Sequence, residues 1–135
     1  MGVSKTPTSV DIAVSGLRAE SLRMNIIARN IANASTSRTE SGQPYRRQHV
    51  VLSTEQEGMG GVSVEEVVAD MLNPFKRVYQ PGHPDADKDG YVLMPNVDLP
   101  VEMIHMMAAS RAYQANAAVL KRYQEMVNVT LELLR

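Results

Sequence analysis

The sequence predicts a mainly α-helical protein, with long N- and C-terminal helices packed as an antiparallel coiled-coil-like pair and a small β-hairpin or extended arm between them. Near each end of the chain, apolar residues recur at alternating spacings of four and three, which places them along one side of a helix. The middle instead carries prolines, glycines and short apolar runs. Exposing an apolar stripe costs about 25 cal/mol per Å², so each stripe needs a partner in this chain, in another copy or in another protein.

The first helix is expected to begin near Thr8 or Ser9, both of which can cap it, and to end at about Asn33. Gly16 lies inside this helix, where a missing side chain would let a neighbouring helix come close. Simple tolerance of a locally weak position is an equal alternative. The apolar stripe of this helix consists of Val10, Val14, Leu17, Ser21, Met24, Ala28 and Ile31.

The middle of the chain favours short strands. Residues 34–44 read as a polar loop and residues 45–54 as a strand. Valines over 62–68 indicate a second strand, with Gly60 and Gly61 near the turn of a hairpin. Residues 75–79 and 91–94 are shorter strand candidates, and the prolines around them limit how regular a sheet can be.

The last helix is expected to open near Asn96 or Asp98, with Pro100 in its first turn, and to run without a breaker to Arg135. About 37 residues would span about 55 Å. Its apolar face is wide, so it is expected to contact more than one neighbour. One stripe contains Met103, Met106, Ser110, Tyr113, Ala117, Leu120, Gln124, Val127, Leu131 and Leu134, and beside it lie Ala109, Ala112, Val119, Tyr123, Met126 and Leu133.

These elements divide the chain into three parts: a flexible N-terminus over 1–9, a terminal-helix domain over 10–34 and 96–135, and a β- and turn-rich middle segment over 35–95. The chain has 135 residues, a formal net charge of −1 and no cysteine. The absence of cysteine excludes thiol catalysis and disulfides. The net charge close to zero gives no overall positive electrostatic potential that would favour nucleic acid. No apolar run reaches the roughly 20 residues of a transmembrane helix.

One segment imitates a metal site. Residues 85–90, DADKDG, copy the start of an EF-hand calcium loop. The remainder does not fit, because Asn96 stands where a bidentate Glu is required and Leu93 offers no side-chain oxygen. We therefore expect a turn with a solvated acidic rim and no bound metal. A calcium-responsive module using Asp85, Asp87 and Asp89 is the alternative.

No other motif carries chemistry. The histidines at 49, 83 and 105 lie far apart and lack helical ligand spacing, and no nucleophile elbow or phosphate loop is present. Arg46 and Arg47 form a lone basic pair, which is expected on a solvated face or in an interface ion pair. The sequence therefore predicts no catalytic residue, no cofactor and no metal.

Several segments together resemble a known family. Asn30-Ile31-Ala32-Asn33 closes the first helix some fourteen residues after Gly16-Leu17. The characteristic runs that follow lie at 42–46, 60–62, 78–87, 90–92, 94–97 and 109–116, the last reading ASRAYQAN. This pattern covers nearly the whole chain. It resembles the flagellar rod and hook axial proteins, and among them most closely the proximal rod proteins of the basal body.

The resemblance implies a non-enzymatic structural subunit of the bacterial flagellum. Such a subunit would leave the cytoplasm by flagellar type III export, assemble helically around the export channel in the periplasm, connect the base to the distal rod and transmit torque. Its partners would be itself, other rod proteins, and export-gate and basal-body base proteins, with no nucleic acid and no membrane span of its own.

The resemblance and the stripes together also mark residues for the family motif and the assembly interface. Of these, Asn30 and Asn33 are expected to cap the end of the first helix. The residues are Gly16, Leu17, Asn30, Ile31, Ala32, Asn33, Ser110, Arg111, Tyr113, Gln114, Asn116, Leu120, Val127 and Leu131. A different class of protein, a soluble helical adaptor or chaperone that forms a small closed oligomer, is the alternative function.

Overall fold

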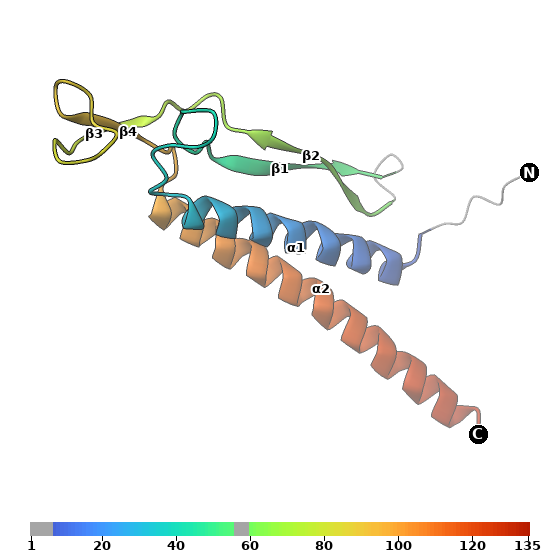
Figure 1. Ribbon diagram of the computed structural model, residues 1–135. Coiled ribbons are helices and arrows are strands. Elements are labelled where there is room, and N and C mark those ends of the chain that lie inside the picture. The colour runs from blue at the N-terminus through green and yellow to red at the C-terminus, as the bar shows by residue number, and fades with distance from the viewer. Residues whose placement is uncertain (1–6, 56–59) are drawn as a thin grey trace, which may run out of the picture.

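A computed structural model describes residues 7–55 and 60–135 of the chain. Two long helices flank four short strands, so the prediction of a mainly helical fold is confirmed (Figure 1). The predicted flexible N-terminus lies largely outside the described residues. In chain order the elements are α1 (Ser9–Ala32), β1 (Gln48–Thr54), β2 (Val62–Ala69), β3 (Lys76–Tyr79), β4 (Tyr91–Met94) and α2 (Leu99–Leu133).

The helices begin where the capping residues predict. Thr8 caps α1 in a reciprocal capping box, in which the Asp11 backbone N–H donates to the Thr8 hydroxyl and the Thr8 N–H donates to the Asp11 carboxylate. Asp98 caps α2, and Pro100 occupies the first turn, where its missing N–H costs nothing. Both predicted helix starts are confirmed.

The two helices lie side by side and run in opposite directions (Figure 1). They approach closely at Gly16, where a Cβ atom would lie 2.6 Å from the side-chain nitrogen of Asn116. Gly16 therefore lies on the contact with α2, and its missing side chain leaves space that the Asn116 amide fills.

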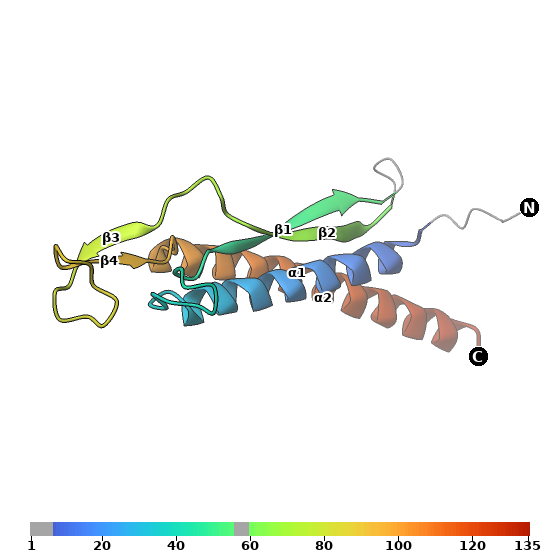
Figure 2. The same ribbon diagram turned by 45° about the horizontal axis from the view of Figure 1, so that its top comes forward.

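α2 has 35 residues and α1 has 24, so α2 continues past the start of α1 (Figures 1 and 2). Every residue from 121 to 135 is exposed. Met126, Val129 and Leu131 are 60 %, 55 % and 60 % exposed, and Leu133 is 81 % exposed. This distal third of α2 (residues 121–133) therefore keeps its apolar side chains in solvent within a single chain.

The predicted stripe of α1 is not its buried face. The buried residues are Ala13, Ala19, Ile26, Ile27 and Asn30, whereas the stripe residues are half-buried or exposed. The reason is that α1 has two neighbours, since α2 lies along one side and the β1–β2 hairpin along another. The buried face of α1 is therefore centred between α2 and the hairpin, and the predicted stripe lies at the edge of this buried face.

β1 and β2 form an antiparallel hairpin with a bulge, because Val51 pairs with Glu66 and Leu52 pairs with Val64, leaving Glu65 unpaired. The hairpin joins α1 through the N–H of Val62, which donates to the Ser15 hydroxyl (3.0 Å). The prediction of a hairpin here is confirmed, although β1 starts three residues later than expected because the preceding side chains enter a polar cluster described below.

β3 and β4 pair antiparallel as a separate two-stranded sheet, with Tyr79 opposite Tyr91. The middle segment thus contains two hairpins and not one. The tyrosine rings meet edge to face at 5.2 Å, and the Arg77 guanidinium stacks on Tyr91. This second hairpin lies beyond the start of α2, at the end of the molecule away from the start of α1 and the end of α2 (Figure 1).

Candidate assembly surface and the polar junction that positions it

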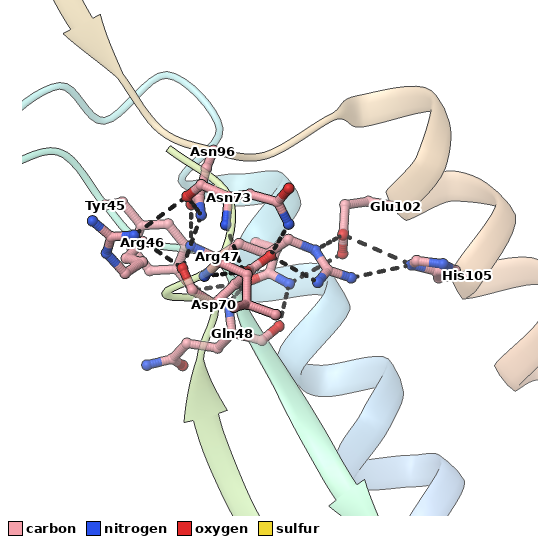
Figure 3. A network of polar contacts seen from close by, with 11 residues as sticks. Tyr45, Arg46, Arg47, Gln48, Asp70, Asn73, Asn96, Glu102 and His105 are labelled. Carbon is pink, nitrogen blue, oxygen red and sulfur yellow. Dashed lines mark hydrogen bonds and ion pairs between the residues drawn. The ribbon is translucent and has the colours of Figure 1, made fainter. Parts of the chain in front are cut away.

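Arg47 stands at the centre of a polar junction between the helices and the two hairpins (Figure 3). Its Nε donates to Oε1 of Glu102, its Nη1 lies 3.7 Å from Oδ2 of Asp70, and its Nη2 lies 3.3 Å from Nδ1 of His105. The Glu102 side chain is fully buried in the first turn of α2. A buried carboxylate is tolerated only when it is paired and hydrogen-bonded, so Arg47 and Glu102 hold the residues before β1 against α2.

Asn30 connects α1 to the same junction. Its amide nitrogen donates to the backbone oxygen of Gln48 (2.8 Å) and to Oε2 of Glu102 (3.1 Å). Its amide oxygen accepts from the backbone N–H of Gln48 (3.0 Å) and the hydroxyl of Tyr45 (2.9 Å). The expected capping role of Asn30 is therefore wrong: this fully buried side chain binds other elements and not the end of its own helix.

Asn33 does cap α1, since its amide nitrogen donates to the backbone oxygen of Arg29 (2.9 Å). Its φ of −102° shows that the cap is not left-handed.

The loop between β2 and β3 is tied to the junction by Asp70 and Asn96. Oδ1 of Asp70 accepts from the backbone N–H groups of Leu72 and Asn73, and Oδ2 accepts from the Asn73 amide (2.7 Å). The Asn73 side chain is the main reason that the pKa of Asp70 lies below its ordinary value, the backbone N–H groups and Arg47 contribute further, and burial opposes them. Asn96 donates to the backbone oxygens of Asp70 and Asn73, both at 3.1 Å.

The junction therefore fixes α1, both hairpins and α2 relative to one another. Burial raises the pKa of Tyr45, and its hydroxyl donates to Asn30. Within residues 7–55 and 60–135, no group of three or more His, Cys, Asp or Glu side chains could hold a metal ion. The arrangement contains donors and acceptors that satisfy each other, which suits a structural joint.

The acidic turn over 85–90 uses its carboxylates locally. Oδ1 of Asp87 accepts from the backbone N–H groups of Asp89 and Tyr91, both at 2.9 Å, and Oδ2 contacts Arg77 at 3.4 Å. These bonds lower the pKa of Asp87, with the Tyr91 N–H the largest cause. Asp85 accepts from the Ser37 hydroxyl (2.7 Å). The carboxylates thus shape the turn that joins β3 to β4.

The predicted motif residues differ in their burial. Those that are buried or half-buried are Gly16, Leu17, Asn30, Ile31, Asn33, Ser110, Asn116 and Leu120. The exposed residues are Ala32, Arg111, Tyr113, Gln114, Val127 and Leu131. Leu17 of α1 and Tyr113 of α2 line one shallow hollow of about 390 Å³ between the two helices.

Sequence reasoning missed most of the junction. Arg46 and Arg47 were expected on a solvated face or in an interface ion pair, yet Arg47 binds Glu102 within the chain and Arg46 stacks on Phe75 at 4.2 Å. Glu102 stands in a helical first turn, where acids are ordinarily exposed. Nothing in its spacing distinguishes it from a surface residue, because its partners are 55 and 72 positions away.

Comparison with known proteins defines the class. Residues 11–38 match the family model described as flagella basal body rod protein. Residues 88–133 match the model described as flagellar basal body rod FlgEFG protein C-terminal. The first match covers most of α1 and the loop after it, and the second covers β4 and α2, so the class is that of the flagellar basal-body rod proteins.

Curated relatives identify the particular family within this class. The chain is 47 % identical over 126 residues to the flagellar basal-body rod protein FlgC of Salmonella typhimurium, covering 91 % of this chain and 93 % of the relative. It is 40 % identical to FlgC of Borreliella burgdorferi, covering 95 % and 97 %, and 41 % identical to FlgC of Agrobacterium fabrum, covering 92 % and 91 %. The chain belongs to the FlgC family of flagellar basal-body rod proteins. It is a structural subunit of the rod and not an enzyme, and the adaptor alternative is not favoured.

Proposed function

We propose that this rod subunit assembles helically around the export channel of the proximal rod through the distal third of α2. One observation supports the proposal: residues 121–133 have an apolar surface that none of the residues described by the structure covers. Val127 is 37 % exposed and Leu131 60 %, on the same side of the helix as the half-buried Leu120. An uncovered apolar strip of this length marks a protein contact.

In this proposal the distal third of α2 packs on α1 of a neighbouring subunit. The half-buried edge of α1, which includes Leu17 and Ile31, and the hollow beside Tyr113 supply a receiving surface that is partly apolar. Within each chain the two helices form a coiled-coil-like pair, and the terminal-helix domain over 10–34 and 96–135 forms the inner tube. The middle segment over 35–95 lies outside it.

The remaining features of the proposal concern location and partners. The chain connects the base to the distal rod and transmits torque, with other rod proteins, export-gate proteins and basal-body base proteins as neighbours. It reaches the periplasm by flagellar type III export. Within the described residues, neither helix is long and apolar enough to cross a membrane.

A pair of matched variants tests the proposal. Leu131→Asp puts a charge on the exposed strip, where burial in a subunit contact costs several kcal/mol. Asn128→Asp adds the same charge about 60° around the helix from Leu131 and about 80° from Leu120, toward the polar side that carries Lys121 and Glu132, so it should be mild. Leu131→Asp should leave the melting temperature of the monomer unchanged but remove rods from basal-body preparations and abolish swimming. Normal assembly of Leu131→Asp would show that this strip is not a contact.

A further inference from the structure

α1 carries a carboxylate that is only partly paired. The Glu20 side chain is 12 % exposed, and its Oε2 atom is buried without a hydrogen-bond partner among the residues that the structure describes. Its other oxygen, Oε1, lies 3.5 Å from Nη1 of Arg23, whose side chain is 42 % exposed. A buried oxygen that has left water without gaining a donor lowers the stability of the fold.

Two contacts fix the position of Glu20 relative to α2. Gly16 lies against Asn116, and Asn30 binds Glu102. Since the helices run in opposite directions and these contacts are equally far apart along both helices, the positions between them can be matched. Glu20 follows Gly16 by one turn on the same face of α1, so it lies level with the turn of α2 that precedes Asn116.

That turn of α2 gives the carboxylate space and no donor. It contains Ala112, which is half-buried, and Ala109, which is fully buried, follows on the same side toward the junction. A methyl group leaves room for a carboxylate but cannot donate a hydrogen bond. The alanines of α2 therefore accommodate Glu20 without stabilising its charge.

Apolar burial along α1 is concentrated near the polar junction. Ile26 and Ile27 are 3 % and 5 % exposed in the half of α1 that ends at the junction. In the half that begins at Ser9, the buried side chains are those of Ala13 and Ala19. An alanine removes much less apolar area from water than an isoleucine, so the first half of α1 gains less from packing.

The first hairpin holds this half of α1 independently of α2. The Ser15 hydroxyl accepts from the backbone N–H of Val62 (3.0 Å), and the buried Gly61 packs directly against the Ser15 side chain. α1 therefore keeps a neighbour on its hairpin side when its contact with α2 is lost.

We infer that Glu20 makes the outer half of the helix pair, residues 9–22 with 110–120, open transiently in the free chain while the polar junction stays closed. Opening returns the Glu20 carboxylate to water, so the carboxylate recovers the solvation that it lacks in the closed form. Opening also uncovers a side of α2 that continues into the apolar surface over residues 121–133. The open chain presents a longer surface for assembly; this use rests on the proposed function, whereas the opening itself does not.

Amide hydrogen exchange of the full-length monomer tests the inference. A helix that loses its packing partner is only marginally stable, so exchange reports the separation of the helices. Protection factors over 16–22 and 110–117 should be at least about tenfold lower than those over 26–31 and 103–108. Residues 110–117 lie in the middle of α2, so fraying of a helix end does not account for fast exchange there.

Substitutions of Glu20 show whether the carboxylate is the cause. Glu20→Met introduces an apolar side chain of similar length and should raise the protection factors over 16–22 and 110–117 by about tenfold, because a packed apolar group replaces a buried charge. Glu20→Gln keeps the shape, removes the charge and should give a smaller rise. Glu125→Gln removes the same charge at an exposed position on α2 and should change nothing.

Uniform protection along both helices of the unaltered chain would overturn the inference. Unchanged protection in Glu20→Met with normal helicity by circular dichroism would overturn it as well. If Glu20→Met does not fold, unchanged protection in Glu20→Gln has the same meaning. Each measurement uses the free chain, so these outcomes leave the proposed assembly standing, and a failed assembly test would leave the opening of the helix pair standing.

Discussion

Gly16 of α1 lies directly against the side chain of Asn116 of α2, so closely that a methyl group at Gly16 would approach the Asn116 nitrogen to 2.6 Å. Asn116 is held in place by donating to the backbone oxygen of Ala112 (3.1 Å). The close approach of the helices therefore depends on both residues: one supplies the space and the other fills it.

A double-mutant cycle tests this pairing. In the Asn116→Ala background, Gly16→Ala should stabilise the chain by up to about 1 kcal/mol, because alanine favours a helix over glycine by that amount. In the unaltered background the same change should give no gain, since the methyl group must displace Asn116 and its hydrogen bond. Urea unfolding of the four proteins gives the coupling. Equal effects in both backgrounds would mean that the two residues do not interact.

Asn30 should contribute far more to stability than Asn33. Asn30→Ala removes four hydrogen bonds at a fully buried site and leaves the backbone groups of Gln48 and one oxygen of Glu102 without that partner. We expect a loss of about 3 kcal/mol in the free energy of unfolding. Asn33→Ala loses the exposed cap bond to Arg29 and the bond from the Thr36 hydroxyl (3.2 Å), and should cost about 1 kcal/mol. A reversed order in chemical denaturation would contradict the structure of the junction.

Asp70 should make the fold sensitive to acid. Its pKa in the folded chain lies below the ordinary value of about 3.9, so the ionised carboxylate stabilises the fold at every pH above that value. This stabilisation disappears as the pH falls through the lower, folded value. Asp70→Asn should therefore be less stable at neutral pH and should lose less stability on acidification. Urea unfolding between about pH 6 and pH 2.5 measures both slopes, and identical slopes would exclude this role.

The acidic turn should not bind calcium as a specific site. Oδ1 of Asp87 already accepts two backbone N–H groups, and Asn96, which would supply the last ligand, is buried in the junction. Calorimetric titration with Ca²⁺ should show no saturable heat in the micromolar range. Asp87→Ala should instead destabilise the turn between β3 and β4. Micromolar Ca²⁺ binding that is lost in Asp87→Ala would show that the turn is a specific calcium site.

Export is expected to depend on the residues before α1. Deletion of residues 2–6 keeps Thr8, whose hydroxyl and backbone complete the capping box of α1. The shortened chain should therefore fold normally and remain in the cytoplasm. Fractionation with immunoblotting checks this, and undiminished arrival in the periplasm would refute it.

The elements most visible in the sequence are those that local chemistry specifies. Thr8 and Asp98 mark the helix starts because capping depends on neighbours within three residues. Tyr91 to Met94 form a strand as expected. The buried face of α1 was predicted wrongly, because a stripe pattern assumes one neighbour and α1 has two. Glu102 and Arg47 could not be paired in advance, since nothing local selects a partner 55 positions away.

The polar junction joins residues that lie far apart in the sequence, so it forms only when the first turn of α2 is present. The hydrogen bonds of the Asn30 side chain need Gln48, which lies 18 positions later in the chain, and Glu102, which lies 72 positions later. Closing so long a loop carries an entropic cost that only the finished set of contacts offsets. A chain that ends at the second hairpin therefore has the bonds of Asn30 to Tyr45 and Gln48 but lacks Glu102, which joins Asn30 and Arg47 to α2. Arrival of the first turn of α2 converts a set of tethered elements into a subunit of fixed shape.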